Sequence, residues 1–415
     1  MKYWKKLSVA EQEQRITEAL KDNIDYKRKM SLGIPASRLD PKVFDDTAVF
    51  LKDAPLLRAY AQNPNHIGCH TLGDSEPFFR GTQNLEKEVI ALLSEDLLKA
   101  APGSCDGYVA SGGTEANLQA VWIYRNYFMR GLGAAINEIG ILSSEDTHYS
   151  VAKSANLLNL RWYSVPVQRH DRSIIAAALE RVVDEAVANG IRYFIVISNM
   201  GTTMYGSIDD PAVYAGCLQS RNLPFKLHVD GAFGGFIYPV SSPGQTINFA
   251  NPLVSSFTLD AHKMLQAPYG TGIFLARKGL MEYVYTREAA YVNGMDITLS
   301  GSRSGANAVA VWMILNAYGP FGWLEKINTL LYRTDWCCRQ LTALGVNFYR
   351  HPQMNIITIA AGSMPPELAA KYGLVPDAHE GVAQWYKIVI MDHVTLDDLE
   401  AFMADYKRAG VPHTV

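Results

Sequence analysis

Two short apolar runs of the chain each end in residues that could do chemistry. The run 225–229 is followed by Asp230, and the run 253–259 is followed, four residues on, by Lys263. If both runs are buried parallel strands, their carboxyl ends lie at one edge of a sheet, where open α/β sheets bind ligands. A lysine that forms a Schiff base and a carboxylate that keeps a pyridine nitrogen protonated are the minimum equipment for pyridoxal phosphate (PLP) chemistry.

The neighbours of these two residues favour a ligand site over the alternative, in which both are surface charges at strand ends. Glycines at 231, 234 and 235 follow Asp230, which indicates that something approaches the backbone closely. His262 directly precedes Lys263, and a Gly-x-Gly turn at 270–272 follows it.

A second cluster, SGGTEAN at 111–117, is predicted to be a strand end, a glycine pair and a helix start. The free N–H groups of a helix start attract anions, and the pair Gly112 and Gly113 lets a phosphate reach the backbone. The cluster lacks the Gly-Lys-Ser/Thr ending of a nucleotide-binding loop, and an ordinary helix cap at Thr114 is the alternative.

Three further polar segments follow or join the predicted strands. His148 follows the run 139–144 and could stack on a flat cationic ring, although a lone histidine is more often structural. Thr202 and Thr203 lie in a glycine-containing segment after the run 193–198, where a simple turn is equally consistent. Arg303, between small residues, suits two-pronged capture of a carboxylate, and a surface linker arginine is the alternative.

The elements that must position these residues alternate along the chain. From about 85 to 277, helical patterns, beginning with 85–99, alternate with strand-like runs at 139–144, 161–167, 193–198, 225–229, 253–259 and 272–276. This alternation predicts a mostly parallel sheet covered by helices on both faces. From about 306 a long apolar helix leads to short strands at 355–360 and 385–391 and a last helix with Thr395 as its N-cap, which indicates a smaller α+β domain.

Composition limits the class of protein. The chain has 415 residues, is 48% hydrophobic and 19% charged, and carries a net charge of −3, so a globular protein without a nucleic-acid or anionic-membrane partner is expected. No run approaches the length of a membrane span, and no secretory signal is evident. Five cysteines without a Cys-x-x-Cys pair predict a reduced, cytoplasmic protein without a zinc site. Metalloprotease, serine hydrolase and dinucleotide-binding signatures are absent from the sequence.

The ordered set SGGTEAN, EDTHYS, GTTMYGSID, HVDGAFGG, DAHK and SGSRSG resembles the fold type I PLP enzymes of the group II decarboxylase family. It is most similar to the short archaeal-type tyrosine/aspartate decarboxylases, over roughly residues 65–405, and SGSRSG and DAHK also resemble sphingosine-phosphate lyases. The resemblance implies a large domain with a mostly parallel seven-stranded sheet between helices, and a smaller C-terminal α+β domain. The expected division is an N-terminal helical arm at 1–64, a PLP-binding domain at 65–304 and a small domain at 305–415.

The resemblance also implies roles for individual residues. Lys263 forms the Schiff base, Asp230 pairs with the pyridinium, and His148 stacks on one ring face and assists catalysis, while Ala232 packs on the other. The remaining cofactor contacts are Gly112, Gly113, Thr114 and His262 at the phosphate, Ser302 at the phosphate across a dimer interface, and Thr203, or alternatively Thr202, at the ring oxygen. Arg303 binds the substrate carboxylate. His66, His70, Phe78 and Phe79 lie in a segment that lines the substrate pocket of relatives.

The expected activity is decarboxylation of an L-amino acid to the primary amine and carbon dioxide by a homodimer with a shared active site. The alternatives are carbon–carbon lysis of the sphingosine-phosphate type and an inactive binding relative. The chain departs from the family at Gly231, where many relatives have alanine, and at Asp260, where animal amino-acid decarboxylases have asparagine. The segment after Lys263 is short, so the tyrosine that protonates the intermediate in longer relatives has no clear counterpart; Tyr291 is the candidate. The substrate stays open.

Overall fold

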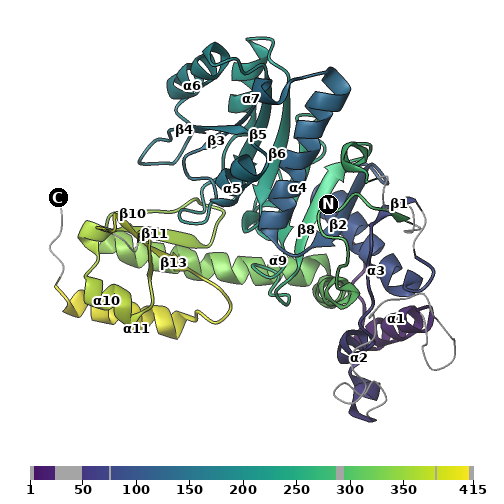
Figure 1. The fold of residues 1–415 in the computed structure, drawn as a ribbon. Helices are drawn as coiled ribbons and strands as arrows, with labels where there is room; N and C mark the ends of the chain where they lie inside the picture. Colours follow the sequence, from purple (N-terminus) through teal and green to yellow (C-terminus); the bar gives the residue numbers. More distant parts are fainter. Residues whose placement is uncertain (1–3, 24–48, 74–75, 287–293, 379–380, 411–415) are drawn as a thin grey trace.

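A seven-stranded sheet forms the centre of the protein, as the resemblance implied (Figure 1). The computed structural model describes residues 4–23, 49–73, 76–286, 294–378 and 381–410. Across the sheet the strands run in the order β2 (Cys105–Ala110), β8 (Gly272–Arg277), β7 (Val254–Asp260), β6 (Phe225–Gly231), β5 (Tyr193–Asn199), β3 (Ile139–Ser144) and β4 (Arg161–Val165). Only β8 runs in the opposite direction to the other strands, so the sheet is mostly parallel. Strand β4 ends before its expected bound because Pro166 has no N–H for the ladder.

Helices cover both faces of this sheet. They are α3 (Arg80–Ala91), α4 (Gly113–Asn126), α5 (Ser150–Leu157), α6 (Ala176–Ala188), α7 (Pro211–Gln219) and the short α8 (Tyr238–Ser241). The helix expected at 85–99 is α3 followed by a π-helical turn, Leu92–Leu97, in which the Leu98 N–H bonds the carbonyl of Leu93. The Ser94 hydroxyl donates to the carbonyl of Ile90, which occupies an acceptor of the regular helix.

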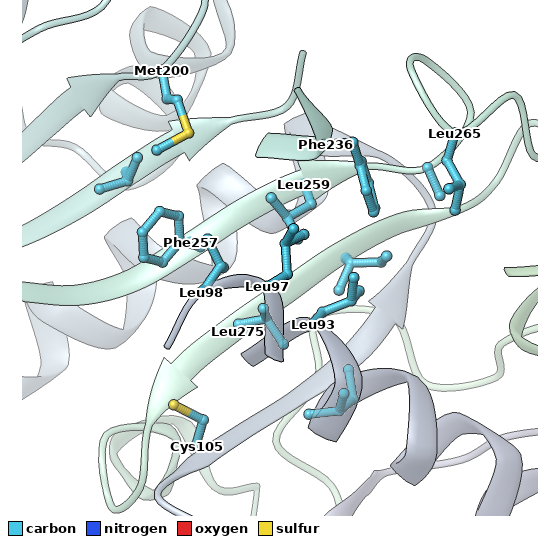
Figure 2. Close-up of a cluster of buried hydrophobic side chains, with 14 of the residues drawn as sticks. Leu93, Leu97, Leu98, Cys105, Met200, Phe236, Phe257, Leu259, Leu265 and Leu275 are labelled. Carbon is cyan, nitrogen blue, oxygen red and sulfur yellow. The ribbon is translucent and has the colours of Figure 1, made fainter. Parts of the chain in front are cut away.

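The apolar core lies on the face of the sheet that α3 covers. Alternate residues of a strand point to opposite faces, and Leu259 of β7 and Leu275 of β8 share this face. Figure 2 shows both beside Leu93 and Leu97, with Phe257 further along β7. The opposite face is covered by α4 and has its own apolar cluster, which includes Phe274 of β8.

A smaller antiparallel sheet follows in the chain. Its strands run in the order β10 (Phe348–Tyr349), β11 (Ile356–Ala360), β13 (Trp385–Val389) and β12 (Val375–Pro376), with α10 (Pro366–Lys371) and α11 (Leu396–Arg408) packed beside it. Thr395 caps α11, as predicted: its hydroxyl accepts from the Asp398 N–H, and the Asp398 carboxylate accepts in return.

The long helix α9 (Gly305–Ala343) joins the two sheets (Figure 1). It is kinked at Gly319, whose φ of 62° is easily adopted only by glycine, and at Pro320, which lacks an N–H. Its first half packs in the large core through Trp312 and Leu315, and its last turns pack against α11. The predicted boundary at 304/305 therefore coincides with the start of a helix that both domains share.

The N-terminal arm packs on its own chain. Helix α1 (Val9–Lys21) lies against α3 and α9, with Ile16 and Leu20 in the large core. Helix α2 (Pro55–Gln62) contacts α9, and strand β1 (Cys69–Gly73) pairs with β9 (Gly294–Met295). Ile16 and Leu20 are thus covered without a second subunit, whereas Val9 is exposed. Among the described helices, none combines the length and the apolar character needed to cross a membrane.

Candidate active site

A pocket of about 350 Å³ lies at the carboxyl edge of the parallel strands. Residues that follow β2, β3, β5, β6 and β7 line it, because parallel strands bring their carboxyl ends to the same edge. The lining residues are Ser111, Gly112, Gly113, Thr114, Glu115, Asn117, His148, Tyr149, Asn199, Gly201, Thr202, Thr203, Asp230, Ala232, Phe233, Asp260, His262 and Lys263. The residues predicted from the separate motifs around Lys263, Asp230, His148 and Gly112 are thereby brought together.

Lys263 lies in the turn that follows β7. Its side chain is 34% exposed, and its Nζ is 3.0 Å from Oδ2 of Asp260, the last residue of the strand. The Lys263 N–H bonds the carbonyl of Asp260, which holds the turn. The Asp260 carboxylate therefore holds the Lys263 amine at the pocket, where a ligand can still reach the amine.

Asp230 approaches the pocket from β6. Its Oδ2 accepts a hydrogen bond of 2.7 Å from Nδ2 of Asn117, and its Oδ1 accepts one of 3.1 Å from the Ala232 N–H. Both donors are neutral, so the carboxylate keeps its negative charge uncompensated and can pair with a cationic group in the pocket. The SGGTEAN motif did not predict a role for Asn117. Its place four residues after Gly113 puts it on the same side of α4, and this spacing is the signal that could have identified it.

His148 lies between β3 and α5. Its Nδ1 accepts from the Ser150 N–H at 3.2 Å and lies 2.9 Å from Ser150 Oγ. Burial lowers the pKa of His148; the charge of Asp230 opposes this effect and that of Lys263 adds to it. The ring is therefore neutral at pH 7, with its proton on Nε2, because Nδ1 is an acceptor.

The start of α4 fits a phosphate group. Its first N–H groups have no partner within the helix, and a side chain at Gly113 would place a Cβ 2.7 Å from Asp260 Oδ2. Beside it, the buried Nδ1 of His262 has no hydrogen-bond partner among the described residues, and such an orphaned polar atom calls for a ligand. Together with the Lys263 amine and the Asp230 carboxylate, these features fit PLP.

The turn after β5 brings one unexpected residue to this edge. The Thr202 hydroxyl is used inside the turn, 2.7 Å from Ser207 Oγ, whereas Thr203 is exposed and lines the pocket. The carbonyl of Thr203 accepts a 2.9 Å bond from Nζ of Lys387, on β13 of the small domain. Burial lowers the pKa of Lys387, and the charge of Lys263 adds to this effect. Nothing in the sequence near Lys387 marked it, because only the packing of the small domain brings it here.

Arg303 lies elsewhere, in a buried cluster behind β2. Its Nη1 donates to Glu86 Oε1 at 2.5 Å and to the Val109 carbonyl, and its Nη2 donates to the Gly68 carbonyl. Burial alone would raise the pKa of Glu86, but Arg303 and then His66 hold it well below its usual range. The guanidinium makes its hydrogen bonds inside the fold and does not line the pocket. The geometry therefore does not support the expected binding of a substrate carboxylate by Arg303.

The other substrate and interface candidates also lie outside the pocket lining. His70, on β1, is buried in the same cluster, with its Nε2 3.4 Å from Glu86 Oε2, and His66 Nδ1 is 2.7 Å from that oxygen. Ser302 is exposed and its hydroxyl accepts from Asn65 Nδ2. Tyr291, the candidate proton donor, lies outside the described residues.

Replacing Arg303 by methionine should strongly destabilise the fold. The change leaves the buried Glu86 carboxylate without its cation, which typically costs about 3–5 kcal/mol. Urea unfolding of the purified variant measures the loss. Arg408→Met, at an exposed ion pair with Asp405, is the control and should change stability little. A stable Arg303→Met protein with a raised KM alone would instead support a substrate role.

Comparison with known proteins agrees with this geometry. The pyridoxal-dependent decarboxylase conserved domain matches residues 81–344. The chain is 50% identical to a tryptophan decarboxylase of Clostridium sporogenes, over 100% of this chain and 99% of that one, and 31% identical to a probable L-tyrosine/L-aspartate decarboxylase of Methanocella arvoryzae, over 86% and 94%. The crystal structure of L-methionine decarboxylase from Streptomyces sp. 590 superposes with a TM-score of 0.69 at 22% identity, covering 98% of each chain. The chain belongs to the pyridoxal-dependent decarboxylase family and is a PLP-dependent amino acid decarboxylase.

Proposed function

We propose that this decarboxylase converts L-tryptophan to tryptamine and carbon dioxide. The observation that carries the proposal is the 50% identity, over the whole chain, to a tryptophan decarboxylase. The pocket wall supports it, because Tyr149 and Phe233 line the pocket and offer apolar ring surface to an aromatic side chain.

The substrate is tested by offering the purified, PLP-loaded enzyme L-tryptophan, L-tyrosine, L-phenylalanine, L-aspartate, L-histidine and L-methionine in parallel. Carbon dioxide and the matching amine are measured for each. We expect the highest kcat/KM for tryptophan, with tryptamine as the product. A preference for aspartate, histidine or methionine would contradict the proposal, although the enzyme would still be a decarboxylase.

We also propose how the pocket residues divide the work. Lys263 attaches the cofactor covalently, Asp230 faces the ring nitrogen, and the start of α4 with His262 holds the phosphate. His148 and Ala232 lie against the ring, and the Thr203 hydroxyl, rather than that of Thr202, contacts the ring oxygen. When bound, PLP supplies the electron sink for the pair left behind as the carboxylate departs.

Lys387 is our candidate for holding the substrate carboxylate. The Lys387 amine donates to the carbonyl of Thr203, a residue that lines the pocket, and a substrate carboxylate beside this amine offsets the burial that lowers the pKa of Lys387. Arg303, the residue suggested by the sequence, already has Glu86 as its counter-ion.

Replacing Lys387 by alanine should raise KM for the amino acid by about 10-fold to 100-fold, the range expected for losing a partly buried charged hydrogen bond. Lys387→Arg should recover part of the loss because it restores the charge. Steady-state kinetics separates the KM effect from kcat. The control is Lys371→Ala, since Lys371 is an exposed lysine of the same domain, paired with Asp405. Unchanged KM in Lys387→Ala would remove Lys387 from substrate binding.

A homodimer with a shared active site remains our proposal for the assembly. Tyr269 is 87% exposed while its ring lies 5.3 Å from that of His262 at the pocket, and Leu299, in the segment before Arg303, is also exposed. Apolar side chains exposed beside an active site are typical of a surface that a partner covers. Sedimentation velocity at assay concentration should show a dimer, and a fully active monomer would contradict it.

We place the enzyme in the cytoplasm, because its five cysteines are free thiols. Recovery of the activity from an extracellular or periplasmic fraction would contradict this.

A further inference from the structure

A row of buried polar side chains runs beneath α4, on the sheet face that also carries the apolar cluster around Phe274. His228 and Asp230 are two residues apart on β6 and therefore point to the same face, and Ser256 and Thr258 do the same on β7. The register places His228 beside Ser256 and Asp230 beside Thr258. All four are buried, in a layer where apolar residues would pack equally well, so their polarity needs an explanation.

Asn117 of α4 joins this row to the pocket. Its Nδ2 donates to Asp230 Oδ2 at 2.7 Å and to Ser150 Oγ at 3.0 Å, and its Oδ1 lies 3.0 Å from Nε2 of His228. Asn117 is almost fully buried, and each of its polar side-chain atoms has a partner. One amide thus touches the carboxylate on one side and, through Ser150, reaches His148 on the other.

The donors in this network can be ordered. Burial lowers the pKa of His228 to about 4, so the ring is neutral and carries one proton. The amide oxygen of Asn117 can only accept, which puts that proton on Nε2, where the Thr258 hydroxyl also lies 3.0 Å away, and leaves Nδ1 to accept from Ser256 Oγ at 2.6 Å. Ser256 Oγ in turn accepts from the Tyr124 hydroxyl, two helical turns from Asn117 on α4.

The donors can also be assigned in the hydrogen bonds that lead from Asn117 through Ser150 to His148. Ser150 Oγ accepts from Asn117, so its own hydrogen is free to donate to His148 Nδ1 at 2.9 Å. This bond and the Ser150 N–H hold the His148 proton on Nε2. The orientation of the Asn117 amide, which His228 fixes, therefore decides what is donated to both Asp230 and His148.

We propose that Asn117, held in one orientation by His228, is a positioning residue that sets both the Asp230 carboxylate and the protonation of the His148 ring at the cofactor site. The inference rests on the proposed roles of Asp230 and His148. Loss of the Asn117 donor leaves Asp230 with one neutral donor and leaves Ser150 free to turn its hydroxyl. An aspartate at position 117 instead places a second carboxylate against Asp230, and two carboxylates in contact hold a shared proton near neutral pH.

The test measures PLP binding itself, by titrating apoenzyme with PLP and following protein fluorescence and the visible absorption band between pH 5 and 9. We expect Asn117→Ala to weaken PLP binding about tenfold or more, the scale of losing one hydrogen bond to a charged group. Asn117→Asp should add a new step to the pH dependence of binding and of the absorption band, which packing damage alone does not produce. The control is Asn316→Ala, at a buried asparagine of α9 whose amide nitrogen donates to the carbonyl of Trp312, away from the pocket.

Two further variants keep the result interpretable. His228→Phe removes the proton that orients the amide and should weaken PLP binding as Asn117→Ala does, whereas His228→Gln keeps an N–H donor and should bind within about threefold of the wild type. This pair decides the question if Asn117→Ala does not fold. Wild-type affinity and an unchanged pH profile in His228→Phe or in a folded Asn117→Ala protein would overturn the inference. Asp230→Ala, measured in parallel, separates failure of this inference from failure of the proposed role of Asp230. If Asp230→Ala also binds PLP with wild-type affinity and spectrum, the proposed role of Asp230 is wrong.

Discussion

Replacing Lys263 by alanine should abolish decarboxylation, with a fall in kcat of about 10⁴-fold or more. Lys263 is the amine that lines the pocket next to Asp260, and covalent attachment of the cofactor needs a primary amine at that point. Lys263→Arg keeps the charge beside Asp260 but offers no such amine, so we expect it to be equally inactive. Carbon dioxide release from L-tryptophan, measured with saturating PLP, is the assay.

The control for this change is Lys278→Ala, at an exposed lysine that follows β8. It should keep wild-type turnover. Treatment of the wild-type enzyme with borohydride, followed by peptide mass analysis, should place the mass of the reduced cofactor on the peptide that contains Lys263. Attachment at another lysine, or turnover by Lys263→Ala above about 1% of wild type with no added amine, would remove Lys263 from this role.

Asp230→Ala should lower kcat/KM by about 10³-fold, the scale on which preorganised charges contribute to catalysis. The carboxylate accepts from Asn117 and from the Ala232 N–H, both of which are neutral, so its charge remains available to a protonated ring nitrogen. Asp230→Asn removes only the charge and should account for most of the loss. The absorption spectrum should change with the rate, because the same charge sets the protonation of the cofactor ring.

Asp106 supplies the matched control, since it is a buried aspartate of β2 in the same sheet and does not line the pocket. Asp106→Asn should leave the spectrum and kcat/KM close to wild type. If Asp230→Asn behaves like this control, electron withdrawal in the pocket does not depend on Asp230, and another group must hold the ring proton.

Most of the large sheet could be predicted from local patterns, for a physical reason. Runs such as 139–142 and 272–276 have no charged or hydroxyl side chain because their strands are buried on both faces, and short apolar runs separated by helical periods have few other ways to fold. The strand order, the antiparallel direction of β8 and the sharing of α9 between domains are not encoded in any single segment. They follow from contacts between residues far apart in the chain.

The meeting of Asp230 with Lys263 was determined by the sequence alone, because each follows an apolar run and parallel strands end at a common edge. The sequence alone did not determine which groups the arginine and lysine side chains would contact. A long cationic side chain pairs with whichever carboxylate the fold brings near, and Arg303 found Glu86, 217 positions away in the chain. Lys387 was brought to the carbonyl of Thr203 by the packing of the small domain against that turn. Likewise, only the packing of α4 against β6 places Asn117 between Asp230 and His228, because the role of a short amide depends on the groups that surround it.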